Sequence, residues 1–115
     1  MHISSFMLWS QDELKTFLKA AGCKLVVVEF SAKWCGPCQR MYPLVHAMSL
    51  QYRNVMFANV DVDDSRELAQ TYHIKAVPTF QMFKQAQKVC FHGNWQSSII
   101  ESSESKKRPG GIQDG

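Results

Sequence analysis

Residues 26–38 read VVVEFSAKWCGPC, and this stretch decides the fold. Its first part is a nearly continuous apolar run, rich in valine, that is typical of a strand covered on both faces. Cys35 and Cys38 follow with the spacing of one helical turn. Pro37, between them, suits the first turn of a helix because its missing N–H would have no partner there. The stretch therefore predicts a strand that leads into a helix with two thiols at its beginning.

This placement favours reversible thiol–disulfide chemistry. Two cysteines within one turn can close a small ring, so the oxidised state is reachable without moving the fold. The N-terminus of a helix offers free backbone N–H groups and the positive end of the helix dipole, both of which stabilise a thiolate. Because the thiolate is the nucleophile in disulfide exchange, we expect Cys35 to ionise more readily than a free cysteine.

Two other interpretations of the cysteine pair are half of a zinc site and a pair of buried core thiols. A structural zinc site needs four ligands. The sequence has no second CxxC and no HxxxH, and its other cysteines and histidines share no spacing. This favours redox chemistry and predicts no metal. Cys23 and Cys90 are isolated, and isolated cysteines are mostly small buried hydrophobic residues.

Length and composition indicate one ordinary globular domain. The chain has 115 residues, of which 45% are hydrophobic and 20% are charged. A net charge of +3 is too small to indicate a nucleic acid partner. No apolar run approaches the roughly 20 residues of a membrane helix, and residues 1–9 lack the basic start of a signal peptide. Cysteines without a secretory signal favour a reducing compartment such as the cytoplasm.

Local patterns predict alternating helices and strands. Ser10 and Glu13 form a capping box before a helix with an apolar stripe, which Gly22 ends. Pro43 should kink the helix that follows the cysteine pair. Its apolar side is predicted to hold Met41, Leu44, Val45 and Met48. The remaining predictions are strands at 24–30 and 55–62, a short helix from residue 64 to 72, and a hairpin of strands 79–84 and 87–91. The predicted class is α/β, a mixed sheet flanked by helices.

Composition changes after residue 94. The segment 95–115 is polar, rich in serine and glycine, and aperiodic, with few apolar residues beyond Trp95, Ile99 and Ile100. Such a segment cannot bury enough apolar surface to fold by itself. We therefore expect a domain at 1–94 and a disordered tail at 95–115.

Several segments resemble the thioredoxin family. Residues 34–38 read WCGPC, the signature of that family, and the segments FSA at 30–32, NVDVDD at 59–64 and PTF at 78–80 stand in the same order as in thioredoxins. The resemblance covers about residues 8–89. Short matches at 46–49, 57–60 and 80–84 are most similar to the spermatid-specific thioredoxins. The resemblance implies a thioredoxin fold whose usual C-terminal helix is degraded or missing here.

The resemblance also assigns roles within the motif. Cys35 would attack as the exposed N-terminal thiolate, Cys38 would resolve the mixed disulfide, and the product would be a Cys35–Cys38 disulfide. Gly36 and Pro37 would support the motif. The implied activity is a protein-disulfide reductase.

A substrate surface follows from the same comparison. Val77-Pro78 resembles the cis-proline loop of thioredoxins, which offers the backbone of Val77 to an extended peptide. An exposed Trp34 beside the nucleophile would contact partner chains. Gly93 is similar to a family glycine near the active site, although it lies one residue closer to the preceding hairpin.

Glu29 lies on the predicted strand and shares a face with Leu25 and Val27. A carboxylate buried there costs several kcal/mol unless paired, and burial raises its pKa. Thioredoxins have an aspartate at the matching position, so Glu29 would accept a proton from Cys38. The alternative is a glutamate at the strand end that points to solvent.

The resemblance further implies partners and a setting. No cofactor would bind to this chain, and electrons would come from a flavin- and NADPH-dependent thioredoxin reductase. Substrates would be proteins with disulfides, and the protein would be a cytoplasmic monomer, also associated with the Golgi apparatus, that serves spermatid and acrosome development. The alternative is a weakly active thioredoxin-like binding variant with an incomplete fold.

Overall fold

The structure, a computed structural model, describes residues 5–85, 87–89, 96 and 99–100. Strands and helices alternate along most of this part of the chain. In order they are β1 (Ser5–Met7), α1 (Gln11–Ala21), β2 (Leu25–Ser31), α2 (Gly36–Gln51), β3 (Val55–Asp61), α3 (Arg66–Thr71), β4 (Thr79–Lys84) and β5 (Gln87–Val89).

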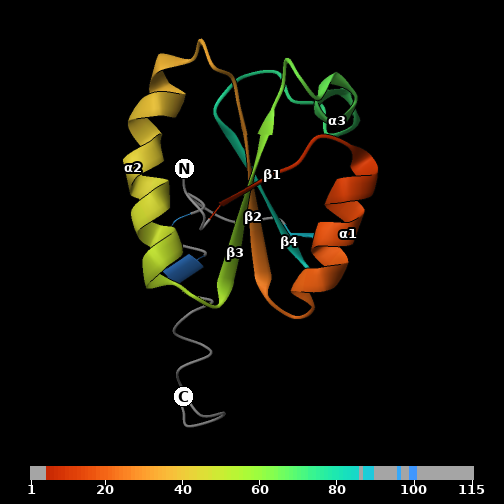
Figure 1. The fold of residues 1–115 in the computed structure, drawn as a ribbon, viewed down its shortest axis with the longest axis vertical. Helices are drawn as coiled ribbons and strands as arrows, with labels where there is room; N and C mark the ends of the chain where they lie inside the picture. Colours follow the sequence, from red (N-terminus) through yellow and green to blue (C-terminus); the bar gives the residue numbers. More distant parts are fainter. Residues whose placement is uncertain (1–4, 86, 90–95, 97–98, 101–115) are drawn as a thin grey trace, which may run out of the picture.

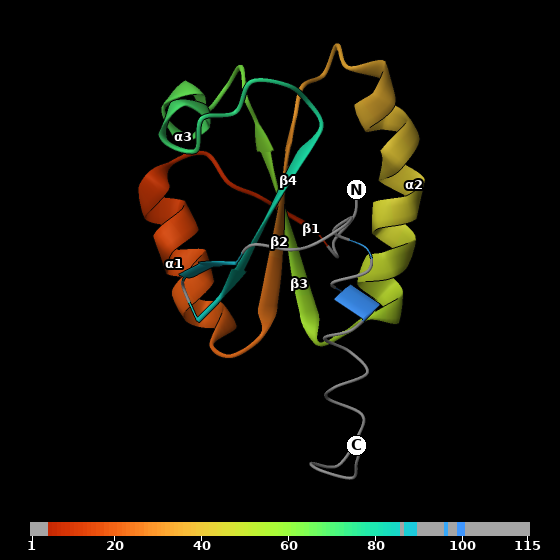
Figure 2. The same cartoon turned by 180° about the vertical axis from the view of Figure 1, so that it is seen from behind.

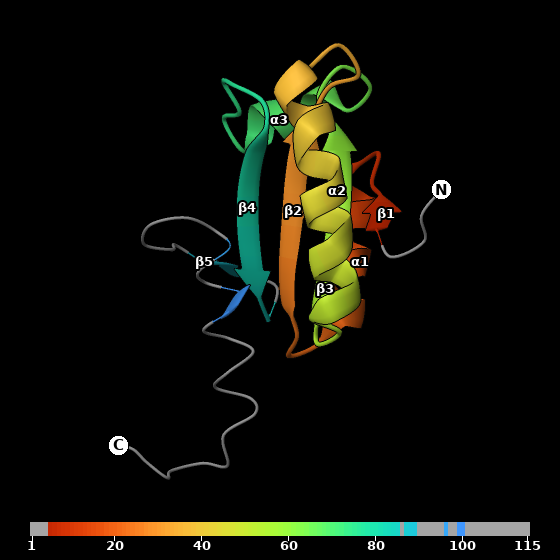
Figure 3. The ribbon, with the colours of Figure 1, turned by 90° about the vertical axis from the view of Figure 1, so that its left-hand side faces the viewer.

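The strands form one mixed sheet in the order β1-β3-β2-β4-β5. β1, β3 and β2 run parallel, whereas β4 is antiparallel to β2, and β5 is antiparallel to β4. Helix α2 covers one face, and α1 and α3 cover the other (Figures 1 and 2). Figure 3 looks onto the α2 face with β4, β2 and β3 behind the helix. The predicted mixed sheet flanked by helices is confirmed.

Most predicted elements exist with ends shifted by a residue or two, but β1 was not predicted. β1 is a three-residue strand at the edge of the described sheet, where it pairs with β3. So short a strand shows no measurable alternation along the sequence. Its identity depends on the parallel partner, with Phe6 placed opposite Ala58. The outer half of the predicted second hairpin strand, residues 90–91, lies outside the described residues.

Helix α1 begins and ends where its caps predict. The Ser10 Oγ accepts the N–H of Glu13 at 3.2 Å. The Glu13 carboxylate accepts the backbone N–H of Trp9 at 2.6 Å, one residue earlier than in the usual capping box. Gly22 ends the helix with φ +62°, a backbone angle that residues other than glycine rarely adopt.

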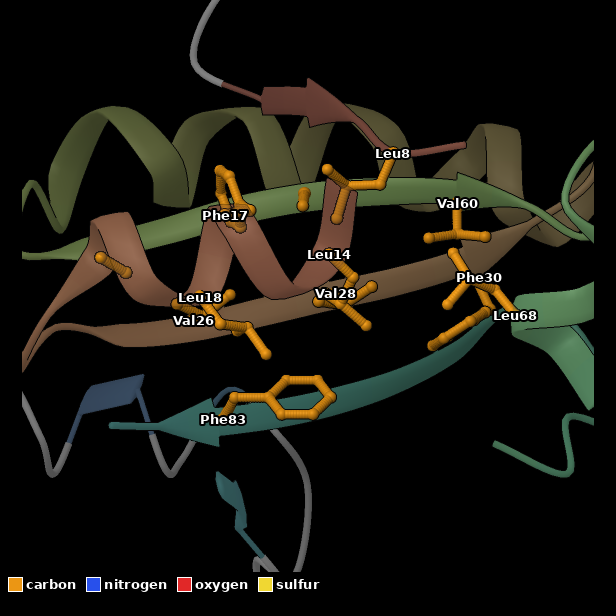
Figure 4. Packing of buried hydrophobic residues seen from close by; sticks show 12 residues of the cluster. Leu8, Leu14, Phe17, Leu18, Val26, Val28, Phe30, Val60, Leu68 and Phe83 are labelled. Atoms are coloured by element: carbon orange, nitrogen blue, oxygen red, sulfur yellow. The ribbon is translucent and has the colours of Figure 1, made fainter. Parts of the chain in front are cut away.

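The core on the α1 side is built from the even-numbered residues of β2. Val26, Val28 and Phe30 are each at most 1% exposed. In Figure 4 they face α1, α3 and the Phe83 ring of β4. The Tyr72 ring closes this core, with its centre 6.0 Å from that of Phe30 and 5.8 Å from that of Phe83.

The core on the α2 side joins the odd-numbered residues of β2 to the inner face of α2. Leu25 and Val27 pack there with Val45 and Met48. The prediction that Leu44 shares this apolar side is wrong, since Leu44 is 40% exposed. At 100° per residue, the buried positions 38, 45 and 48 and the partly buried position 41 form a stripe, and residue 44 falls at its edge.

Ile99 belongs to the same core. It has helical backbone, as do Gln96 and Ile100, and its side chain is completely buried against the α2 side of the sheet. Ile99 lies beyond the domain boundary expected at residue 94. The sheet therefore receives at least one apolar side chain from the C-terminal segment, while residues 101–115 lie outside the described part.

Candidate active site

The two cysteines of the motif form a disulfide at the beginning of α2. Their sulfur atoms are 2.18 Å apart and their Cα atoms 5.3 Å apart. Cys35 is the N-cap of α2, and its Sγ accepts the backbone N–H of Cys38 at 3.0 Å. Gly36 is the first helical residue, and Pro37 lies exposed in the first turn. The predicted passage from strand to helix is correct, with β2 ending at Ser31.

Both cysteines are buried in this disulfide form. Cys35 is 2% exposed and Cys38 is 6% exposed. They pack with Ala32, and the side chains of Val62 and Val77 lie against them. The exposed Cys35 thiolate implied by the family resemblance belongs to the reduced protein and stays a prediction, whereas Cys35 is covered in the disulfide form. The loops after β3 and before β4 converge on the same end of the sheet (Figure 1) and supply the covering side chains.

Trp34 forms an exposed apolar surface beside the disulfide. Its side chain is 71% exposed, and its Nε1–H donates to Asp63 Oδ2 at 2.8 Å. Asp61 shapes the loop that carries Asp63, because Asp61 Oδ1 accepts the backbone N–H groups of Asp63 and Asp64. The indole is thus anchored by its polar edge while its rings face solvent.

The Val77–Pro78 peptide bond is cis. Val77 is half-buried, and its side chain contacts the cluster formed by Ala32 and the two cysteines. The family-based expectation of a cis bond at this position matches the structure. Gly93, the other predicted substrate residue, lies outside the described residues.

Glu29 is buried on the face of the sheet that α2, the helix of Cys38, covers. The residue is 8% exposed, and its neighbours across the sheet are Asn59 on β3 and Phe80 on β4. Burial raises the pKa of its carboxyl from 4.5 to about 7. The solvent-facing alternative does not match this position.

A hydrogen bond that the sequence did not suggest lies next to Glu29. The Ser31 hydroxyl donates to Asn59 Oδ1 at 2.8 Å. These residues are far apart in the chain and become neighbours only through the register of β2 and β3. The signal in the sequence was limited to a serine two residues after the glutamate, on the same strand face.

Cys23 differs from its prediction. It was expected to be a small buried hydrophobic residue, but it is an exposed free thiol in the turn between α1 and β2. A polar turn exposes its residues because their backbone groups need water. Cys90 lies outside the described residues. Among the residues that the structure describes, no group of three metal-binding side chains is assembled, and no helix is long and apolar enough to cross a membrane.

Comparison with known proteins identifies the family of this chain. A family model described as Thioredoxin matches residues 6–104. The chain belongs to the thioredoxin family. It is 56% identical over 100 residues to human thioredoxin domain-containing protein 8, a match that covers 77% of this chain and 79% of the relative. It is 64% identical over 80 residues to the rat protein of that name, covering 70% of this chain but only 63% of the relative.

A solved structure shows the same fold. The X-ray structure of Fasciola hepatica thioredoxin superposes with a TM-score of 0.75 at 34% identity, covering 86% of this chain and 96% of that one. Thioredoxin family membership, together with a Cys35–Cys38 pair at disulfide distance, supports dithiol–disulfide redox activity. The general class is thiol–disulfide oxidoreductase.

Proposed function

We propose that this protein reduces disulfides in other proteins through the Cys35–Cys38 pair. The observation that carries the proposal is the position of Cys35, whose sulfur caps α2 and accepts the Cys38 N–H at 3.0 Å. A hydrogen bond and a helix N-terminus both favour the thiolate over the thiol. Reduction of the disulfide therefore yields a nucleophile that is ready to attack at neutral pH.

In the first step, the Cys35 thiolate attacks one sulfur of a substrate disulfide. A bond forms between Cys35 Sγ and that sulfur, the substrate S–S bond breaks, and the other substrate sulfur leaves as a thiolate that takes a proton from water. The product is a mixed disulfide between Cys35 and the substrate.

In the second step, Cys38 resolves the mixed disulfide. Its thiol gives its proton to the Glu29 carboxylate, and its sulfur bonds to Cys35 Sγ. The bond from Cys35 to the substrate breaks, and the electron pair leaves with the second substrate sulfur. A carboxyl with a pKa of about 7 is half ionised at neutral pH, so it can take this proton and later release it to water.

Trp34 and Val77 would provide the contact surface for the substrate chain. Trp34 is exposed and anchored, and Val77 adjoins the disulfide, so an extended peptide could lie across both. No cofactor is needed by this chain, because the two cysteines carry the electron pair. A flavin- and NADPH-dependent thioredoxin reductase would supply it.

We extend the proposal to the biological setting from the resemblance of residues 46–49, 57–60 and 80–84 to the spermatid-specific thioredoxins. On that resemblance we propose a monomeric reductase of spermatids that acts in the cytoplasm and at the Golgi apparatus during acrosome formation; the chain is 56% identical over 100 residues to human thioredoxin domain-containing protein 8. This part rests on analogy and not on the geometry of the site.

The test is reduction of insulin disulfides by the purified full chain, with dithiothreitol in one arm and thioredoxin reductase plus NADPH in the other. We expect activity that Cys35→Ser abolishes and Cys23→Ser leaves unchanged. Cys38→Ser should accumulate a mixed disulfide that is visible on a non-reducing gel. A folded protein, checked by circular dichroism melting, that reduces nothing in either arm would contradict the proposal. If the protein reduces insulin in the dithiothreitol arm but not in the thioredoxin reductase arm, only the proposed electron donor is overturned.

A further inference from the structure

Arg40 is a charged side chain beside the cysteine motif to which the two reaction steps give no role. It lies one helical turn after Gly36 on α2, and residues four apart share one face of a helix. Side chains of a helix lean toward its N-terminus, so Arg40 reaches back over the first turn. The spacing agrees, since a Cβ atom at Gly36 would lie 3.5 Å from Arg40 Nη1. The guanidinium therefore lies beside the backbone that separates Cys35 from Cys38.

Arg40 has no ionic partner among the described residues. Its side chain is exposed, and the first turn of α2 contains no acidic residue that could hold the guanidinium. A cation near the N-terminus of a helix also faces the positive end of the helix dipole, so this position brings α2 no stability. The charge of Arg40 is thus free to meet a molecule that binds at the motif.

The acidic side chains of the neighbouring loop are already engaged by other groups. Asp63 Oδ2 accepts the Trp34 indole N–H, and Asp64 Oδ2 lies 3.6 Å from Lys33 Nζ. Asp61 accepts two backbone N–H groups of its own loop. The remaining charged residues at this end of the sheet are exposed on α3 and on the loop before β4 (Figure 1), and they are Arg66, Glu67 and Lys75. On the α2 border of the site, the free charge that a substrate meets is positive.

We propose that Arg40 is a specificity-determining residue that binds an acidic side chain next to the disulfide of a substrate protein. The inference rests on the proposed function and names the class of substrate that this site prefers. A peptide whose sulfur meets Cys35 has its neighbouring side chains between the loops, which carry Trp34 and Val77, and α2, which carries Arg40. A guanidinium can bind a carboxylate through two parallel N–H···O bonds, which adds direction to the attraction of charge.

Such a contact changes the choice of substrate and leaves the chemistry of the cysteine pair as it is. Arg40 attracts the acidic chain before the Cys35 thiolate attacks, and it forms no bond with the reacting sulfur atoms. Substrates with acidic neighbours should therefore react faster than basic ones, whereas a neutral substrate should be insensitive to Arg40. An effect of Arg40 on the Cys35 thiolate would instead change the rates of all substrates by the same factor.

The experiment uses the reduced full chain with Cys23→Ser and Cys90→Ser, so that only the pair reacts. Its substrates are three peptides, each with one cysteine linked to 2-thiopyridine through a disulfide, and identical except that aspartate, serine or lysine flanks the cysteine. Cys35 Sγ bonds to the peptide sulfur, the S–S bond breaks, and the pyridine sulfur leaves with the electron pair and takes a proton from water to give pyridine-2-thione. Cys38 then displaces the peptide thiol. The rate of thione release is divided by the rate with 2-mercaptoethanol, which corrects for the reactivity of each peptide.

The protein with Arg40 should attack the aspartate peptide about three to five times faster than the serine peptide, the size expected for one exposed ion pair. Arg40→Gln should remove this preference and leave the rate with the serine peptide unchanged. Arg40→Glu should reverse the preference in favour of lysine, and added salt should weaken it in the parent protein. Arg53→Gln is the matched control. It removes an exposed arginine beyond the other end of α2 and lowers the net charge equally, so it should keep the preference.

The outcomes separate the two proposals. If the parent protein attacks the peptides but never releases them as free thiols, the proposed reductase function fails. If it releases them and shows no preference for aspartate, or if Arg40→Gln keeps that preference, the inference about Arg40 alone is overturned. An equal fall in all three rates in Arg40→Gln would also overturn it, because the effect would then lie in the Cys35 thiolate and not in the recognition of the substrate.

Discussion

The Cys38 backbone N–H points at the sulfur of Cys35, which accepts it at 3.0 Å. A sulfur in this position does the work of the serine or aspartate that usually caps a helix. The hydrogen bond that caps α2 is therefore also the one that stabilises the Cys35 thiolate. Reduction of the disulfide leaves a nucleophile whose charge already has a partner.

Selective alkylation should reveal this thiolate. Reduced protein treated with limiting iodoacetamide between pH 5 and 7 should be modified first at Cys35, because a capped thiolate forms at lower pH than a free one. Mass spectrometry of peptides gives the order of labelling. Cys23 is exposed but lacks the helix N-terminus, so it serves as the internal control and should react later. Equal labelling of Cys35 and Cys38 would show that the roles are assigned wrongly.

Replacing Glu29 by glutamine should slow resolution and spare the first attack. The amide cannot take the proton of Cys38, and loss of a general base costs roughly 100-fold or more. Stopped-flow measurement of the two thiolate releases separates the steps. Glu67→Gln, an exposed carboxylate on α3, is the matched control and should behave like the wild type. Unchanged resolution in Glu29→Gln would exclude Glu29 as the proton acceptor.

The raised pKa of Glu29 should also appear in the pH dependence of stability. The folded protein holds the Glu29 proton up to about pH 7, whereas the unfolded chain releases it near 4.5. Between these values the folded state binds more protons, so the free energy of unfolding falls as pH rises, by at most about 3 kcal/mol. Urea denaturation at pH 4, 6 and 8 should show Glu29→Gln gaining stability on the wild type as pH rises. A constant difference across this range would contradict the burial of an ionisable Glu29.

Ile99 should contribute to the stability of the domain. It is completely buried on the α2 side of the sheet, so Ile99→Ala should lower the free energy of unfolding by roughly 2–5 kcal/mol. Ile100→Ala is the matched control, because that side chain is 40% exposed and its loss should cost far less. Thermal or urea unfolding measures both. Equal small effects would mean that the sheet does not depend on the C-terminal segment.

Local patterns in the sequence determined the parts of this protein that depend on neighbours along the chain. The valine run before the cysteine pair, the Ser10 cap and the Gly22 stop each place an element end within a residue or two, because capping and alternation act over a single turn or strand. The motif and its position after a strand were sufficient to identify the chemistry. The alternation of residues along β2 also placed Glu29 on the face of the sheet that α2 covers.

Tertiary structure decided what depends on partners distant in sequence. The register of β2 and β3 joins Ser31 to Asn59, and the same parallel pairing turns residues 5–7 into a strand. Convergence of two loops buries Cys35, while a turn at the other end exposes Cys23. Ile99 lies in a segment whose composition indicates disorder, yet it fills a space left open by the sheet and α2. Composition indicates how much apolar surface a segment can bury by itself. The burial of one side chain depends instead on the apolar surface that the rest of the chain offers it.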